Sequence, residues 1–286
     1  MRWAVSSGCR SPKKSSLREG RRMKRFSGLL RLYVWHMKLS VSRAMMYRFD
    51  FVTGLVISIA LSGIGPFVQY LYFTNTRGYP GWTLDQVLLF QGLLLLWFGL
   101  RDLLFGDLRN TVMNMVWKGE FDRLLLKPYP PIGVLLCSGF QLNGIGSCIA
   151  GVSLTVVSYM RLHVPFEWTM APLLLLLLIS GVVLFMAITI FYCAIVIMLV
   201  QMGRIGEMMD MVTNFGNYPI NIYPALLQMA MVTCLPFAVW TYYPAQILLD
   251  RADNGLWLAA ACCFGLFGLS IMYWNRSLRK YTSAGG

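Results

Sequence analysis

The 29 residues "PLLLLLLISGVVLFMAITIFYCAIVIMLV", at positions 172–200, contain no charged side chain. A helix needs about 20 apolar residues to cross the hydrocarbon core of a bilayer, because each residue advances it by about 1.5 Å. This stretch therefore predicts a transmembrane helix. The chain of 286 residues is 57% hydrophobic and 13% charged, so we expect an all-α membrane protein.

Five further apolar stretches predict a total of six transmembrane helices. The other five are expected at 51–73, 87–105, 132–160, 222–243 and 256–274. The fifth is the least regular, because residues 211–249 lack any charge and would measure about 58 Å as one helix. Four prolines must break that stretch. We expect Tyr223 and Trp240 to mark the two membrane interfaces, with residues 242–249 in the outer interface.

The basic residues predict the orientation of the chain. With six crossings and the N-terminus inside, 21 of the 25 Lys and Arg residues lie in inside segments and three lie in outside loops. Such an excess predicts that both termini are cytoplasmic. It also accounts for the net charge of +13 without nucleic acid, so we expect membrane lipids and no nucleic acid among the partners.

The N-terminal region divides into two parts. Residues 1–22 are basic and rich in serine, and we expect a disordered tail. Residues 23–50 predict an amphipathic helix, whose apolar side chains follow a helical spacing: Phe26, Leu29, Leu30, Tyr33, Val34, Met37, Val41, Ala44 and Met45. Such a helix suits the membrane interface, and packing against a soluble partner is the alternative.

Several kinds of chemistry are missing from the sequence. A glycine-rich loop ending in Gly-Lys-Ser/Thr, which would hold a triphosphate, is absent. His36 and His163 fall on opposite sides of the membrane, so they cannot form one zinc site. Arg101 and Asp102 are adjacent and are not expected to face each other on a helix. We therefore expect no enzyme activity, catalytic residue, metal or cofactor on this chain.

The third span is rich in small and polar residues. Ser147 and Gly151 form one small-xxx-small pair, which lets helix backbones approach closely. Gln141 and Asn143 need hydrogen-bond partners or a water-filled cavity at membrane depth. Helix packing is one interpretation of this composition, and the wall of a substrate pathway, lined by Gln141 and Asn143, is the other.

A charged element, "WKGEFDRLLLKPYPP" at 117–131, separates the second span from the third. Within residues 107–131, apolar positions recur three and four apart, which indicates a short amphipathic helical piece. Gly119 should interrupt it, and Pro131 can open the next helix at its first turn. We expect a lever that carries the movement of a soluble partner into the two spans. An ordinary solvated loop is the alternative.

Part of this element resembles a known motif. "GEFDRLLLKP" is similar to the Gly-x-Phe-Asp-x-x-Leu-x-Lys-Pro pattern in the cytoplasmic loop of type-2 ABC transporter permeases, specifically the small bacterial permeases with six spans. "YPINIYP" at 218–224, "LPFAVWTYYPAQILL" at 235–249 and "WNRSLRKYTSAGG" at 274–286 resemble later segments of that family. The resemblance covers roughly residues 24–286.

The resemblance implies a type-2 ABC exporter-like fold and a permease subunit that exports a hydrophobic or amphipathic compound across the bacterial plasma membrane. A second permease copy or homologue would complete a homo- or heterodimer, and a separate ATPase subunit would bind ATP and Mg. The residues implied to contact that ATPase are Gly119, Phe121, Asp122, Leu125, Lys127 and Pro128. A membrane scaffold or assembly factor that binds a soluble partner through 107–131 is the alternative function, and a channel is another.

Overall fold

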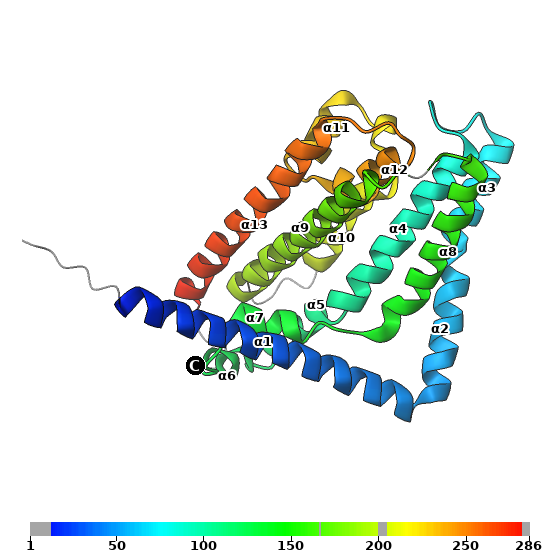
Figure 1. Cartoon of the computed structure of the whole chain (residues 1–286). Helices are drawn as coiled ribbons and strands as arrows, with labels where there is room; N and C mark the ends of the chain where they lie inside the picture. Colours follow the sequence, from blue (N-terminus) through cyan, green and yellow to red (C-terminus); the bar gives the residue numbers. More distant parts are fainter. Residues whose placement is uncertain (1–12, 166, 200–204, 282–286) are drawn as a thin grey trace, which may run out of the picture.

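The computed structural model describes residues 13–165, 167–199 and 205–281, and in the first helix it describes side chains from Ser27 onward. Every regular element in these ranges is helical. Figure 1 shows long helices standing side by side, with α1 (Lys13–Met46) lying across one end of them. We call this the α1 end, and the other, where α12 (Tyr242–Leu248) lies, the α12 end. The predicted all-α fold is confirmed.

Five helical segments of the described chain are long and apolar enough to cross a membrane. They match the predicted spans at 51–73, 87–105, 172–200 and 256–274, and part of the third. The first is α2 (Arg48–Ser62) continued by α3 (Ile64–Asn75), and the second is α4 (Leu84–Phe105) continued by α5 (Leu108–Trp117). The third is the 3-10 turn η1 (Leu142–Gly144) with α8 (Ile145–Leu162), and the other two are α9 (Met170–Leu199) and α13 (Gly255–Lys280).

The bundle separates the segments that the charge distribution assigns to opposite sides. The first helix, the loop that follows α4 and the end of α13 gather at the α1 end (Figure 1). Arg161 is in the last turn of α8, Arg77 follows α3 and Arg251 precedes α13, so all three belong to the α12 end. This arrangement agrees with the topology expected from the basic residues.

The third span begins later than the sequence predicts. We expected one helix over 132–160, but α7 (Pro131–Cys137) is a separate short helix and α8 starts only after a break and one 3-10 turn. In the break, the Gln141 N–H donates a hydrogen bond to the Leu103 carbonyl on α4 (3.1 Å). The apolar side chains of α7 are covered by protein rather than lipid, so hydrophobicity alone placed the boundary wrongly.

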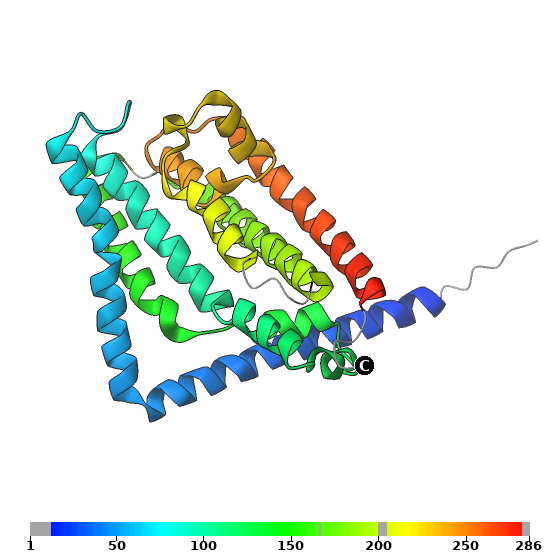
Figure 2. The same ribbon diagram turned by 180° about the vertical axis from the view of Figure 1, so that it is seen from behind.

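The predicted fifth span, 222–243, is not a single helix. α11 (Ala225–Thr233) and the helical segment Phe237–Leu248 are bent by 75° relative to each other, with Pro236 in the break. Both lie at the α12 end (Figure 1). Before α11, the chain runs beside α9 from the α1 end toward the α12 end (Figures 1 and 2). This part consists of α10 (Ile205–Thr213) and the 3-10 turns η2 (Asn214–Asn217) and η3 (Ile220–Ile222).

Trp240 lies inside the bundle, so the prediction that it marks a membrane interface is wrong. Its side chain is 6% exposed, and its indole N–H donates to the Gly181 carbonyl on α9 (3.3 Å). Its ring stacks on that of Trp97, with centroids 5.5 Å apart. The bend before Phe237 turns Trp240 toward α4 and α9. Tyr223 is half-buried.

The first helix begins at Lys13, inside the segment 1–22 for which we expected disorder. Residues 13–22 contain Lys, Arg, Glu and Leu, which favour helices, and contain no proline. The amphipathic pattern that starts near residue 23 therefore extends an existing helix and does not mark its beginning. Residues 1–12 lie outside the described residues.

α1 divides its predicted apolar stripe between two surroundings. On one side, the Cys137 thiol donates to the Leu29 carbonyl (3.4 Å), and the ring of Tyr33 meets Phe140 edge-on at 6.1 Å. On the other side several large apolar residues stay exposed: Leu30, Val34, Trp35, Val41 and Met45. The helix thus packs on its own chain and still presents an apolar face of the kind that enters a membrane interface.

Small residues let α4 and α8 approach closely. A Cβ atom added to Gly99 would lie 2.5 Å from the backbone nitrogen of Cys148, and one added to Gly151 would clash with the backbone of Leu96. Because these contacts are with backbone atoms, a side chain cannot be accommodated by a small rotation. The packing interpretation of the third span is confirmed at these positions.

Candidate functional site

The element between α4 and α8 starts with α5 (Leu108–Trp117), whose C-cap residue, Lys118, is followed by Gly119. Gly119 has φ of +67°, a conformation that costs glycine little. Its N–H donates to the Val116 carbonyl (3.2 Å), and the Glu120 N–H donates to the Met115 carbonyl (2.8 Å). These two bonds form a Schellman motif, which satisfies the last carbonyls of a helix. The predicted interruption at Gly119 is confirmed.

Phe121 opens the short helix α6 (Phe121–Leu125) and is fully buried in its own chain, at 0% exposure. Its ring meets Tyr281 edge-on at 5.1 Å and Trp274 at 6.4 Å. Leu124, one turn later, is buried beside it. The resemblance implied that Phe121 contacts an ATPase, but in this structure its ring fills a pocket formed by the end of α13 in the same chain.

Asp122 contacts the C-terminal end of α13 as well. Burial raises the pKa of Tyr281, and a side-chain hydrogen bond with Asp122 raises it further. A raised pKa keeps the phenol protonated, so its O–H donates to the carboxylate. The residue at the N-cap of α6 is Glu120, and no side-chain capping bond is present there. The Asp122 carboxylate therefore joins α6 to the residue that follows α13.

The exposed apolar side chains of this element are Trp117, Leu125 and Leu126, at 64%, 40% and 86% exposure. We call these three residues the apolar knob. Leu125 was among the predicted contact residues, but Trp117 and Leu126 were missed. The exposure of Trp117 could have been predicted from helical spacing. Trp117 lies off the helix face formed by Val112 and Val116, which are both buried.

The remaining predicted contact residues are near the apolar knob in sequence. Lys127 and Pro128 are exposed, and Gly119 is half-buried with free space around it. Pro131 occupies the first turn of α7, as predicted. The predicted contact set is therefore split: Phe121 and Asp122 turn toward the chain, whereas Leu125, Lys127 and Pro128 are accessible from outside it.

An ion pair joins the same element to the irregular fifth crossing. Arg109 on α5 lies 2.6 Å from the carboxylate of Asp210 on α10. A small cavity beside this pair is lined by residues that include Tyr192 of α9 and Arg101 of α4. Sequence reasoning did not find this contact, because the two residues are separated by 101 positions.

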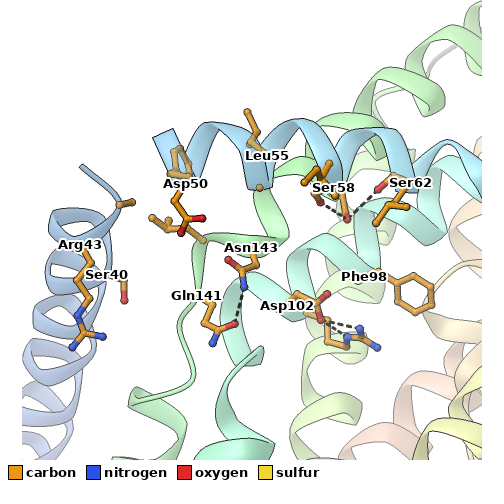
Figure 3. Close-up of a pocket in the computed structure, with 18 of the residues that line it drawn as sticks. Ser40, Arg43, Asp50, Leu55, Ser58, Ser62, Phe98, Asp102, Gln141 and Asn143 are labelled. Carbon is orange, nitrogen blue, oxygen red and sulfur yellow. Dashed lines mark hydrogen bonds and ion pairs between the residues drawn. The ribbon is translucent and has the colours of Figure 1, made fainter. Parts of the chain in front are cut away.

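Gln141 and Asn143 lie on the wall of a groove of about 850 Å³ between α1, α2, α4 and α8 (Figure 3). The amide nitrogen of Asn143 donates to the Gln141 side-chain oxygen at 3.5 Å, a long hydrogen bond. The first predicted alternative, a hydrogen-bond partner, is thus present, because the two amide side chains bond to each other. Whether the groove is part of a substrate pathway stays a prediction.

Arg101 and Asp102 form an ion pair, contrary to the expectation that adjacent residues would not face each other. Both Nε and one terminal nitrogen of Arg101 lie 2.8 Å from the same carboxylate oxygen of Asp102. The guanidinium also lies over the ring of Phe98, 4.9 Å from its centroid. The long Arg side chain folds back far enough to reach its neighbour. Both residues line the groove, and nothing in their arrangement indicates catalysis.

Within the part of the chain that the structure describes, no group of three or more His, Cys, Asp or Glu side chains is arranged to hold a metal ion. The six cysteines in that part are free thiols. The features that can serve a function are therefore the apolar knob at the α1 end, the ion pair behind it and the groove beside it.

These features match one known family. A family model described as "ABC-2 family transporter protein" matches residues 60–285. The chain belongs to the ABC-2 transporter family. The match covers most of the chain, from the last turn of α2 to its C-terminal region, and supports the ABC-2 permease part of the predicted resemblance. Comparisons with curated proteins and with solved structures found no match.

Membership explains the architecture of this ABC-2 transporter chain. Proteins of this family are membrane components of ABC transporters, so the chain is a multi-pass transport subunit. The matched range starts near the end of α2, so α1 and most of α2 are described by the structure alone. The element from α5 to α7 lies well inside the matched range.

Proposed function

We propose that this ABC-2 chain is the permease subunit of an ATP-driven exporter of a hydrophobic or amphipathic compound in the bacterial plasma membrane. The α1 end would face the cytoplasm, because the segments richest in Lys and Arg gather there. The family supports transport. The direction and the partners are part of the proposal.

Energy would come from a separate ATPase subunit that binds ATP and Mg, because the sequence contains no loop that could hold a triphosphate. The observation that carries this part of the proposal is the apolar knob. Trp117 and Leu126 are highly exposed on an element whose backbone is held on both sides. Exposed apolar residues on an anchored loop are typical of a protein-binding site.

Force on the apolar knob has two routes into the bundle. Phe121 packs on Trp274 at the end of α13, and Arg109 pairs with Asp210 at the start of the fifth crossing. A partner that pushes α6 would therefore move two membrane segments together. Through this linkage, ATP-driven closure of the ATPase would open the transport path alternately to the two sides of the membrane. In this proposal Phe121 transmits force within the chain and does not contact the ATPase directly.

A second permease copy or homologue would cover the fifth crossing. The segment from α10 to α11 contains 3-10 turns and leaves many large apolar side chains exposed, among them Met208, Met211, Phe215, Leu226 and Met229. Irregular backbone within the hydrocarbon region is stable only where protein or a water-filled cavity surrounds it. We infer that two such segments face each other in a homo- or heterodimer.

The test is co-purification of the ATPase subunit with variants of the apolar knob. Trp117→Ala and Leu126→Ala should each reduce the amount of bound ATPase, because truncating a buried interface anchor commonly costs about 2 kcal/mol or more. Trp168→Ala is the matched control, since Trp168 is 84% exposed but lies between α8 and α9 at the α12 end.

Two results would contradict the proposal. Unchanged ATPase binding by both variants of the apolar knob would remove its assigned role. A purified complex that lacks any ATPase would favour the alternative functions, a membrane scaffold or a channel. A scaffold would still lose its soluble partner on mutation of Trp117, but its activity would not require ATP.

A further inference from the structure

The groove between α1, α2, α4 and α8 is separate from the apolar knob and from the exposed apolar residues of α10 and α11. The proposed coupling to an ATPase does not use it. It runs along α2 from Asp50 to Ser62. Twelve residues of helix correspond to about 18 Å, so the groove extends from the α1 end toward the middle of the bundle. This length suits a molecule with a polar head and an apolar tail.

The charged residues of the groove form two pairs, Arg43 and Asp50 at its α1 end and Arg101 and Asp102 on α4, beside Phe98. Its lining contains two arginines and two aspartates, so the formal charges cancel. Arg101 and Asp102 neutralise each other. Arg43 on α1 and Asp50 on α2 are both exposed, and neither forms an ion pair with any residue that the structure describes. Figure 3 shows these two residues on neighbouring helices at one corner of the groove.

The lining combines polar and apolar side chains along its whole length. Gln141 and Asn143 lie near the α1 end. Farther along α2, the hydroxyls of Ser58 and Ser62 each bond to the Ser147 hydroxyl, at 3.5 and 3.2 Å. The apolar side chains of the lining include Phe51 and Leu142 near the α1 end and, farther along the groove, Leu55, Ile57, Leu61, Leu95 and Phe98. The groove therefore offers two charges at the α1 end that are unpaired within the described residues and, deeper in the bundle, apolar contacts beside a neutralised ion pair and serine hydroxyls.

The surroundings of α2 favour lipid as the source of the occupant. Within the most apolar window of the segment Arg48–Asn75, no residue is buried in the protein. One wall of the groove is therefore a helix that lipid can approach from the side. A molecule can enter laterally from the leaflet at the α1 end without crossing the bundle.

We propose that this groove binds one zwitterionic phospholipid from the leaflet at the α1 end. Its phosphate would pair with Arg43, its ammonium group with Asp50, and one acyl chain would lie along α2. An anionic lipid would satisfy Arg43 but leave Asp50 unpaired beside a second negative charge. The site requires neither an ATPase nor transport, so it is independent of the proposed function.

The first experiment measures lipid binding to the purified full-length chain by native mass spectrometry. The chain is incubated with equal amounts of phosphatidylethanolamine and phosphatidylglycerol. We expect the zwitterionic lipid to be retained preferentially. Asp50→Asn should lower the ratio of bound phosphatidylethanolamine to phosphatidylglycerol by roughly tenfold, the scale of one charge-assisted bond. Arg43→Gln should weaken binding of both lipids.

A matched control separates the groove from the general attraction of lipids to basic residues. Arg48 is exposed near the same corner but does not line the groove, so Arg48→Gln should leave the lipid ratio unchanged. A preference for phosphatidylglycerol in the unmodified chain would overturn the proposal. The same holds if Asp50→Asn leaves the ratio unaltered, or if no lipid is retained.

The second experiment fills the groove without changing its charges. Gly54 lines the groove, and a Cβ atom added there would meet nothing within 4 Å. Gly54→Phe should therefore fold and displace the lipid. Gly265→Phe is the control, because Gly265 on α13 has the same free space but lies outside the groove. Equal lipid retention by both variants would contradict the site.

Discussion

The guanidinium of Arg109 and the carboxylate of Asp210 lie 2.6 Å apart and join α5 to α10. One residue belongs to the element that carries the apolar knob, and the other to the irregular fifth crossing. The side chains remain 35% and 52% exposed, so water screens the pair and its contribution to stability is expected to be below about 1 kcal/mol. In the proposed mechanism its role is to make the two elements move together.

Exchanging the charges of this pair tests the linkage. Arg109→Asp alone should reduce substrate-stimulated ATP turnover of the assembled transporter with little change in thermal stability, and Arg109→Asp combined with Asp210→Arg should restore it. A double-mutant cycle gives the coupling. The same exchange at Arg161 and Asp85, a 3.9 Å pair at the α12 end, should have no effect. Failure of the double variant to recover would argue against the linkage.

Truncation of Phe121 should destabilise the chain itself. Phe121→Ala removes a fully buried ring between Tyr281 and Trp274, and such changes cost about 3–5 kcal/mol. Thermal unfolding of the purified chain in detergent measures the effect. Trp117→Ala, an exposed substitution, should stay within about 0.5 kcal/mol of the unmodified chain. A similar loss for both variants would contradict the different roles assigned to the two rings.

The bond between Asp122 and Tyr281 should persist across the physiological pH range. The folded-state pKa of Tyr281 is raised above its ordinary value of 10.0. The stability that neutral Tyr281 contributes is therefore fully present below pH 10 and lost as pH rises through the folded-state pKa. Tyr281→Phe should abolish this alkaline loss and should be non-additive with Asp122→Asn. Additive effects on the unfolding temperature would show that the two residues act separately.

Adding one methyl group between α4 and α8 should be costly. Gly99→Ala would place a Cβ atom 2.5 Å from the Cys148 backbone nitrogen, and forced separation of packed helices costs about 1–3 kcal/mol. Gly265→Ala should be neutral or stabilising, because its Cβ meets nothing within 4 Å and alanine favours helix. Comparable melting temperatures for the two variants would contradict the close packing.

Cysteine labelling in intact cells tests the orientation. In a chain whose seven native cysteines are replaced by serine, single cysteines at Arg161 and Asp253 should react with an impermeant reagent from outside. Cysteines at Lys118 and Lys280 should react only after the membrane is opened. The excess of basic residues at the α1 end supplies the reason. Labelling at position 118 from outside would reverse the orientation.

The sequence by itself determined the membrane class, four of the spans and the existence of the element from 107 to 131. Long apolar runs and an uneven charge distribution act through the bilayer, which treats each segment almost independently of its neighbours. Gly119 and Pro131 were placed correctly for a similar reason, since the φ angle of each residue is a local property.

Only the tertiary structure decided which side of the element faces outward. Hydrophobicity does not distinguish Phe121, which is buried against α13, from Leu126, which is 86% exposed, because both are apolar residues in the same short segment. For the same reason, the sequence placed the start of the third span too early and did not show that the fifth span is divided. Apolar surface covered by protein and apolar surface covered by lipid have the same composition, and only the packing of distant segments separates them.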